Sequence, residues 1–286
     1  MRQILVSLIV LAVLAPSVAS AQVYTIHMSV AVRAGQSYGV SASGSKILKI
    51  SSEDRLVSKD EYQVGFEGRA EVLEVDSSGR PVKLAFIVEK FTKSADGAST
   101  TLLKPGSVIM ADGAQVQPFS LKDGTLDETA QEVFGVVYSA HKPNDVSDDE
   151  IFGTKELKGI GESWPVNPSQ AYESFKETGF VIPEGHLEGT VTLVAKDRIA
   201  SADCLSIRGD VQADVIAAKA LPGGVTLERG RLQAAFRGCF PAESSGLSYK
   251  EGADISVQMR VVPKDRPKLD FTYSQKSDLV WLATGK

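Results

Sequence analysis

The 286-residue chain is poor in the residues and motifs that carry most enzyme chemistry. It has two cysteines and three histidines, too few for most metal clusters or haem arrays. It contains no G-x-x-x-x-G-K-[ST], H-E-x-x-H or C-x-x-C motif, and so no recognisable phosphate loop, zinc-protease helix or redox pair. We therefore predict no catalytic residue, no metal site and no cofactor.

Positive charge and long apolar runs are also scarce. Lys and Arg number 31 against 36 Asp and Glu, a formal net charge of −5, so we expect no nucleic-acid partner. After the first 21 residues no stretch approaches the roughly 18 apolar residues of a membrane-spanning helix, so an integral membrane protein is not expected. The content of 43% hydrophobic and 23% charged residues argues against disorder, collagen and coiled coil.

The first 21 residues have the layout of a signal peptide. Arg2 supplies the positive start, Ile4–Leu14 an apolar core, and Ala19-Ser20-Ala21 a small-x-small cleavage site. The pattern predicts export, with cleavage between Ala21 and Gln22 and a periplasmic or extracellular mature protein. An N-terminal membrane anchor is the alternative.

Apolar and polar residues alternate through most of the remaining chain. From Tyr24 to Val32 every even position is apolar, which is typical of a half-buried strand. The alternation returns from Tyr62, slips by one position at Leu73 as expected of a β-bulge, and resumes after a turn at 76–79 to complete a hairpin. Further strands are expected within 187–193, 205–215, 232–240, 255–261 and 269–273, with turns near Asp197-Arg198 and at Leu221–Gly224.

This pattern predicts a mainly β protein, with a large curved antiparallel sheet or half-barrel of about 11–12 strands and one wet face. Residues 22–286 would form a single β-rich domain. Gly35-Gln36-Ser37-Tyr38 resembles Gly161-Glu162-Ser163-Trp164, 126 residues later. Two interpretations stay open: a duplication with similar halves at 22–143 and 158–286, or coincidence between short strings.

Two segments that interrupt the alternation are predicted to be inserted helices. Thr125-Leu126-Asp127-Glu128 fits a capping box with Thr125 as N-cap, which predicts a helix to about Ala140. A second short helix is expected from Pro168 to Thr178, before Gly179. The first helix would bury Ala130, Val133, Phe134, Val137 and Tyr138. Residues 144–150 between the halves are predicted to be a solvated acidic loop, because their spacing matches no EF-hand.

Cys204 and Cys239 both occupy the polar phase of their predicted strands, so both should point away from the apolar face. They flank the turn at Leu221–Gly224 almost symmetrically, and a small bulge would bring them opposite each other. Because exported proteins meet an oxidising compartment, we predict a Cys204–Cys239 disulfide. Two free thiols are the alternative.

The candidate ligand-binding residues are apolar and aromatic. Trp164 precedes a proline in a polar stretch and could stack on a ligand, although aromatic residues more often pack in a core. Phe134, Val137 and Tyr138 lie on the face of the first predicted helix that would meet the sheet. We take these four residues as the candidate binding set.

The signal peptide, the Gly-x-Ser-Tyr strand start, the hairpin turn at 75–81 and Gly161–Trp164 resemble a diffuse group of uncharacterised exported bacterial β-rich proteins. Some of that group are similar to the periplasmic lipoprotein-carrier fold, a curved antiparallel sheet wrapped round helices with an apolar cavity. The resemblance covers most of the mature chain in pattern and identifies no catalytic residue.

Four functional hypotheses follow. The first is an exported, non-catalytic binding protein for an apolar ligand such as a lipid, or for a lipidated protein, in the cell envelope. The second is an envelope structural or protein-interaction module that uses the polar face. The third is a hydrolase whose carboxylates come from distant positions. The fourth is an outer-membrane barrel, which the helices and the lack of aromatic girdles disfavour.

Overall fold

The computed structural model describes residues 22–29, 31–143, 145–176, 180–183, 185–200, 202–218, 221, 224–242 and 248–284. Within these residues the protein is 62% strand and 9% helix, with one large twelve-stranded antiparallel sheet that is not closed into a barrel. This confirms the predicted fold class. The predicted signal peptide and its cleavage site, Val30, and the Pro222-Gly223 pair of the predicted turn all lie outside the described residues.

The chain runs through strands, then helices, then strands again. The first strands are β1 (Val23–Tyr24), β2 (Ser37–Ser52), β3 (Arg55–Val75), β4 (Pro81–Ala95), β5 (Ala98–Leu103), β6 (Val108–Asp112) and β7 (Phe119–Leu121). The middle elements are α1 (Glu128–Val137), α2 (Asp148–Phe152), β8 (Lys158–Gly159), β9 (Ser163–Pro165), α3 (Pro168–Lys176) and β10 (Phe180–Val181). The last strands are β11 (Leu187–Ile199), β12 (Ala202–Val215), β13 (Ala217–Ala218), β14 (Val225–Pro241), β15 (Tyr249–Pro263) and β16 (Leu269–Ala283).

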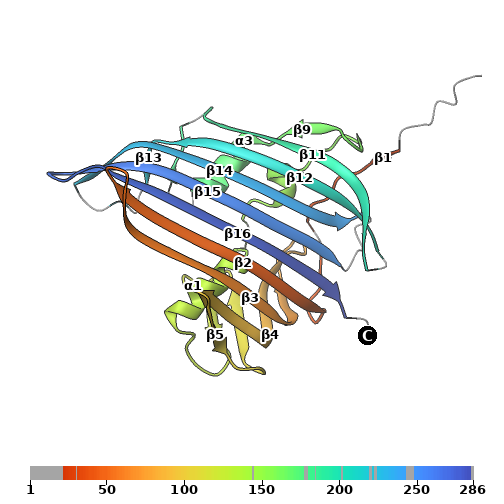
Figure 1. The fold of residues 1–286 in the computed structure, drawn as a ribbon. Coiled ribbons are helices and arrows are strands. Elements are labelled where there is room, and N and C mark those ends of the chain that lie inside the picture. Colours follow the sequence, from red (N-terminus) through yellow and green to blue (C-terminus); the bar gives the residue numbers. More distant parts are fainter. Residues whose placement is uncertain are drawn as a thin grey trace, which may run out of the picture.

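The long strands form one continuous sheet that joins both ends of the chain. Its order is β7-β6-β4-β3-β2-β16-β15-β14-β12-β11-β9, with β5 paired to β4 beside this path. Figure 1 shows the last strand, β16, next to the first long strand, β2. Their register runs from Asp270 opposite Ser51 to Ala283 opposite Tyr38. This β2–β16 seam places the two series of hairpins side by side.

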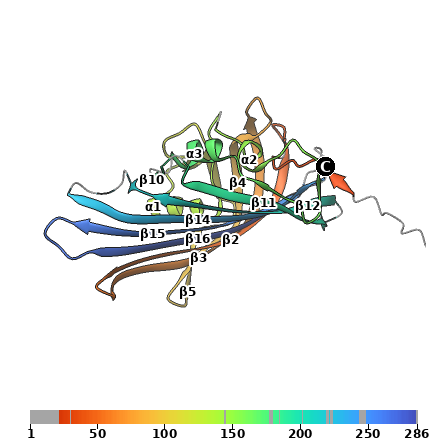
Figure 2. The same cartoon turned by 90° about the horizontal axis from the view of Figure 1, so that it is seen from above.

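The three helices lie on the same face of the sheet, which we call the helix-bearing face (Figure 2). Two apolar clusters fill the space beneath them. The first core surrounds α1 and contains Phe66, Phe86 and Phe134; the second core lies under α2 and α3 and contains Val191, Leu193 and Ile207. Among the residues described, no helix has the length and apolarity needed to cross a membrane.

The alternation of residue types explains this two-faced sheet. Along β3, Tyr62, Val64 and Phe66 are buried on the helix-bearing face, whereas Glu61, Gln63 and Glu67 are exposed on the other. The register between β3 and β4 shifts between Val72 and Glu74, so the bulge predicted at Leu73 is confirmed. Because side chains alternate every residue, an uncompensated slip would have moved the following side chains to the opposite face.

The predicted strand from Tyr24 to Val32 is wrong beyond its first residue, Tyr24. Only Val23–Tyr24 pairs with another strand, β8. The burial pattern nevertheless holds, because Ile26 and Met28 are 3% exposed. The N–H groups of Met28 and Ser29 donate to the carboxylate of Asp149 in α2, at 2.7 and 3.1 Å. A side chain from α2 thus accepts the hydrogen bonds that a neighbouring strand would otherwise have taken.

The helices differ from prediction at their ends. The N-cap of α1 is Asp127 rather than Thr125: its carboxylate accepts the N–H of Ala130 at 2.8 Å. The helix ends at Val137, three residues before the predicted end, because Tyr138 is already extended.

The acidic linker is also more ordered than predicted. Residues 148–152 form α2, with Ser147 and Glu150 in a reciprocal capping box, so the segment is not entirely a loop. Helix α3 begins at Pro168 as predicted and is described to Lys176; residues 177–179, which include its predicted end, lie outside the described residues.

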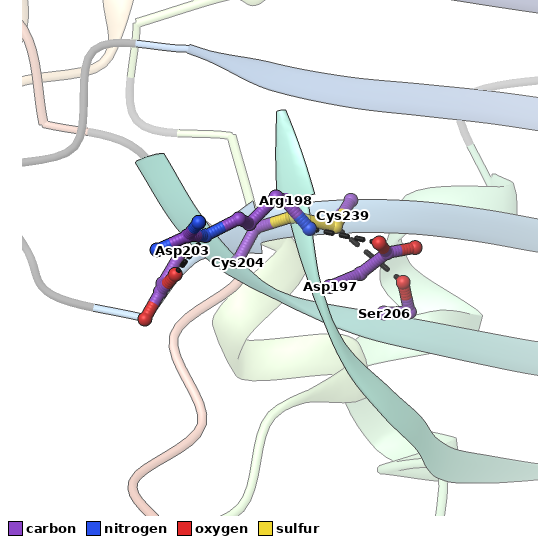
Figure 3. Close-up of a disulfide and its surroundings, with 6 residues drawn as sticks. All are labelled: Asp197, Arg198, Asp203, Cys204, Ser206 and Cys239. Carbon is purple, nitrogen blue, oxygen red and sulfur yellow. Dashed lines mark hydrogen bonds and ion pairs between the residues drawn. A yellow bond between two sulfur atoms is a disulfide. The ribbon is translucent and has the colours of Figure 1, made fainter. Parts of the chain in front are cut away.

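The predicted disulfide is present, with Cys204 and Cys239 Cα atoms 5.4 Å apart. No bulge brings the two residues opposite each other: Cys204 pairs with Pro241 and Ser206 with Cys239, so the bond is diagonal. The disulfide is also more deeply buried than predicted, because Cys204 is 1% and Cys239 8% exposed to solvent. Figure 3 shows it beside the Arg198–Asp203 ion pair and Ser206, whose hydroxyl donates to Cys239 Sγ at 3.4 Å.

The turn expected near Asp197-Arg198 lies further along the chain. Both residues are still in β11, where Asp197 pairs with Cys204 and Arg198 with Asp203. The chain reverses at Ala200, whose φ is 53°. The polar residues Asp197 and Arg198 therefore continue the strand, and a turn predicted from their polarity alone is placed too early in the chain.

Candidate ligand-binding cavity

A cavity of about 350 Å³ lies on the helix-bearing face between the first and second cores. Its floor is formed by β14, β15 and β16, and its walls by the end of α1 on one side and by α2 and α3 on the other. This volume is at the lower end of the range for small-molecule sites. The cavity therefore accommodates one small ligand rather than a large one.

The lining is mostly apolar. The hydrophobic side chains that contribute are Met28, Val136, Val137, Phe152, Phe175, Phe236, Phe240, Ala253, Ile255 and Leu279. Two carboxylates, Asp148 and Glu251, share this lining with His141, Tyr138, Tyr249 and Trp281. Few polar groups in an apolar hollow are the usual composition of a site that orients a ligand.

Two buried polar atoms of the lining lack a hydrogen-bond partner among the described residues. They are the hydroxyl of Tyr138, a residue 7% exposed, and the indole N–H of Trp281, a residue 3% exposed. A buried donor without a partner costs about 1–3 kcal/mol. Both groups are therefore well placed to bond a polar group of a ligand.

Glu251 is a carboxyl group in a largely apolar environment. Burial and, to a smaller extent, the charge of the nearby Asp148 carboxylate together raise its pKa from 4.5 to about 7. The Trp281 indole N–H faces Glu251 and opposes the rise in pKa, but it makes no hydrogen bond of ordinary geometry. Glu251 therefore changes its charge near neutral pH.

Asp148 occupies the first turn of α2. Its side chain is accessible from the cavity, yet protein surrounds it closely enough that burial raises its pKa. His141 and Arg80 oppose this rise, while the adjacent Asp149 adds to it. For Asp148, the effect of burial on the pKa exceeds the opposing effect of these two cationic groups.

Two arginines near the cavity, Arg80 and Arg237, are committed elsewhere. Arg80 forms an ion pair with Asp76 at 3.0 Å and donates to the carbonyl of Asp145 at 2.7 Å. Arg237 pairs with Asp278 at 2.9 Å. Within the described part of the chain, no salt bridge reaches Asp148 or Glu251, so negative charge in the cavity is not balanced by a direct protein partner.

Aromatic rings form one end of the cavity. Tyr249 stacks on Trp281 with ring centres 5.7 Å apart and an interplanar angle of 14°, and Tyr138 lies 6.2 Å from the same indole. Burial raises the pKa of both tyrosines, and the charge of Glu251 raises each further. The two phenols therefore stay neutral and act as hydrogen-bonding groups at ordinary pH.

The wall formed by α1 depends on a close approach at Gly44. A Cβ at this position would lie 2.7 Å from the Lys276 carbonyl oxygen of β16, 2.9 Å from Val136 Cγ1 and 3.0 Å from Val137 Cγ1. Gln275 then fixes the end of the helix, because its side-chain amide donates to the Val136 carbonyl at 3.1 Å. Gly44 and Gln275 thus set the position of the helix end that borders the cavity.

The structure separates the four predicted binding residues. Val137 and Tyr138 line the cavity, whereas Phe134 packs in the first core, with ring centres 5.3 Å from Phe66 and 5.2 Å from Phe86. Trp164 lies in the second core, 5% exposed, and its indole N–H donates to the Phe152 carbonyl at 2.7 Å. Whether any of the four binds a ligand stays a prediction.

Sequence reasoning missed Asp148, Glu251 and Trp281. One signal was available for Glu251: it occupies the apolar phase of β15, in step with Ile255 and Val257. A lone carboxylate in the buried phase of a strand indicates either a partner or a functional site. Asp148 had no comparable signal, because the surrounding acidic segment gave no reason to single it out.

No group of three or more His, Cys, Asp or Glu side chains that could hold a metal ion occurs among the described residues. No family model matches the sequence. No curated protein matches it either.

Solved structures show only distant likeness. A lipovitellin structure determined for its lipid–protein interactions is 10% identical over 89% of this chain and 26% of its own, with a TM-score of 0.38. P47 from Clostridium botulinum A2 is 7% identical over 82% and 81% of the two chains, with a TM-score of 0.17. A mutant Rh. blastica porin is 8% identical over 84% and 99%, with a TM-score of 0.20. The chain spans about a quarter of the lipovitellin chain, and none of these similarities bears on function.

Proposed function

We propose that this protein is an exported binding protein that holds an apolar ligand, such as a lipid, in the cavity between its first and second cores. The observation that carries the proposal is an apolar hollow of about 350 Å³ that contains buried, unpartnered polar atoms of Tyr138 and Trp281. An apolar chain would cover the lining, and a polar head group would lie at the end of the cavity where these two polar atoms are found.

Two further features support the proposal. The Cys204–Cys239 disulfide is consistent with an oxidising compartment outside the cytosol. The cavity lies over the middle of a broad hydrogen-bonded sheet, and Gln275 and Gly44 fix one of its walls. A rigid frame reduces the entropy lost when a ligand binds.

A neutral fluorescent probe, N-phenyl-1-naphthylamine, tests the proposal. The protein should bind it, and Ala253→Phe, which places a ring in the cavity, should weaken binding at least about tenfold, equivalent to 1.4 kcal/mol. Ala98→Phe introduces the same ring at an exposed position of β5 and serves as the control. Binding that is absent, or equal in the two variants, contradicts the proposal.

A second candidate function is favoured by the opposite face of the sheet. A hollow of about 710 Å³ lies there, lined by polar side chains that include Glu188, Asp210, Gln212, Gln233 and Asp254. Such a surface suits an interaction or structural module of the envelope that contacts another protein. Charge reversal at Asp210 and Asp254 should abolish that contact and leave probe binding unchanged.

A further inference from the structure

We infer that the ligand is a single-chain amphiphile with a cationic ammonium head, which lies between Asp148 and Glu251 and against the rings of Tyr138, Tyr249 and Trp281. This inference rests on the proposed function and specifies the chemistry of the same site. The charge, the aromatic content and the size of the cavity each support it.

The charge of the cavity favours a cation. Asp148 and Glu251 both line it, and each lacks an ion pair within the described residues. The basic side chains of Arg80 and Arg237 already pair with Asp76 and Asp278, and His141, which also lines the cavity, forms no ion pair with either carboxylate within the described residues. A ligand carboxylate or phosphate would meet two like charges, whereas an ammonium group would give each carboxylate a charge-assisted hydrogen bond.

The aromatic rings favour the same chemistry. The Tyr249–Trp281 stack and the Tyr138 ring meet at the end of the cavity that holds Glu251. Ring faces attract an ammonium group within about 6 Å of their centres, most strongly where water is excluded. Carboxylates and aromatic faces together provide both the charge and the ring surfaces that a cationic head group uses.

The volume of the cavity argues for one chain. About 350 Å³ is small among ligand sites, and the apolar lining of Phe236, Ile255 and Leu279 continues away from the carboxylates across the floor. A two-chain lipid would need a larger apolar space than this. The single-chain amphiphile therefore fits better than a phospholipid that carries the same ammonium group.

Ligand binding should also move protons. The groups that face Glu251 are Asp148 from α2, Tyr138 after α1, Tyr249 on its own strand and Trp281 on β16. His141, Asp149 and Arg80 act on it through Asp148. The pKa of Glu251 is raised to about 7 because it is buried and lacks a cation, so an arriving ammonium group should lower that pKa and release a proton below neutral pH.

The test compares three ten-carbon ligands by isothermal titration calorimetry: n-decylamine, n-decanol and decanoate. At pH 8 the protein should bind the amine at least about tenfold more tightly than the alcohol, with decanoate weakest. Glu251→Gln and Asp148→Asn should each lower the affinity for the amine several-fold more than the affinity for the alcohol. Glu71→Gln, at an exposed position of β3, should change neither value.

A second measurement needs no variant and so does not depend on variant folding. At pH 6, amine binding measured in two buffers of different ionisation enthalpy should show proton release approaching one proton per ligand, whereas decanol should release none. Vesicles of phosphatidylethanolamine should fail to displace decylamine; displacement would overturn the single-chain assignment.

The outcomes distinguish this inference from the proposed function. If decanol binds as tightly as decylamine, or decanoate binds best, the cationic head group is wrong and the apolar binding function stands. If none of the three ligands binds, the proposed function itself fails. Amine binding without proton release at pH 6 contradicts the assigned position of the head group next to Glu251.

Discussion

Replacing Glu251 with Gln should make the protein more stable at neutral and alkaline pH, although the change removes a side chain from the candidate site. Burial, and next the charge of Asp148, raise the pKa of Glu251 to about 7 in the folded protein, against 4.5 for an unperturbed glutamate. The folded state therefore favours the protonated form more than the unfolded chain does. Gln keeps the shape of that neutral form and cannot ionise.

The sign and the size of the effect follow from this difference. Below pH 4.5 Glu251 is protonated in both states, and its favourable neutral form is fully present. As pH rises towards 7, the unfolded chain releases the proton and the folded protein retains it, so stability falls. A rise from 4.5 to about 7, at about 1.4 kcal/mol per pKa unit, gives roughly 3 kcal/mol lost by pH 8.

Urea denaturation at pH 4.5, 6, 7 and 8 measures this difference directly. Glu251→Gln and the wild type should differ little at pH 4.5, and the variant should gain up to about 3 kcal/mol by pH 8. All other titrating groups are common to both proteins and largely cancel. Glu71→Gln, on the exposed face, should run parallel to the wild type. A pH-independent difference, or a variant that is less stable at pH 8, would refute the reasoning.

The remaining predictions concern packing and chain topology. Asp127→Ala should cost about 1 kcal/mol because it removes the N-cap of α1, whereas Thr125→Ala should leave the denaturation midpoint unchanged. Replacing both Cys204 and Cys239 with Ser should lower stability by about 3–4 kcal/mol, as chain-entropy reasoning gives for a separation of 35 residues, visible as a lower Tm. Gly44→Ala should cost about 1–3 kcal/mol by forcing α1 away from β2, and should weaken probe binding because that helix borders the cavity.

The sheet could be predicted because its signal is local. Side chains alternate between faces with a period of two, so the sequence near Tyr62 indicates which residues are buried without knowledge of the partner strand. The same rule predicts that Ile26 and Met28 are buried, yet it does not reveal what pairs with their backbone. That partner is Asp149, about 120 residues away, and only tertiary structure brings it there.

The disulfide shows where such reasoning reaches its limit. The symmetric placement of the two cysteines about the Leu221–Gly224 turn predicts that they meet, and they do. The detail differs because β12 and β14 pair without a bulge, which places Cys204 opposite Pro241 and leaves the bond diagonal. Secondary-structure phase predicted the face to which the cysteines point, but not how far neighbouring chain shields them.

The cavity could not be predicted because its polar groups come from distant positions. Tyr138 and Asp148 flank the linker between the first two helices, and Glu251 and Trp281 lie on the last two strands. They meet only because β16 pairs with β2 and brings the two cores into one sheet. Tyr138 was among the predicted binding residues, and of the residues that were missed Glu251 alone left a trace in the sequence, as a carboxylate in the apolar phase of its strand.

That carboxylate also explains why a binding role fits better than a purely structural one. We expect an ionised Glu251 to lower stability by roughly 3 kcal/mol at pH 8, a substantial part of the 5–15 kcal/mol by which domains are usually stable. An apolar side chain at this position would pack against Leu279 and Ile255 without that loss. The neighbouring Asp149 shows the contrast, because its carboxylate accepts two backbone N–H groups and holds the N-terminal segment in place. Asp149 is thus accounted for by the fold alone, whereas Glu251 and Asp148 form no salt bridge within the described residues, and the proposed cation would supply that partner.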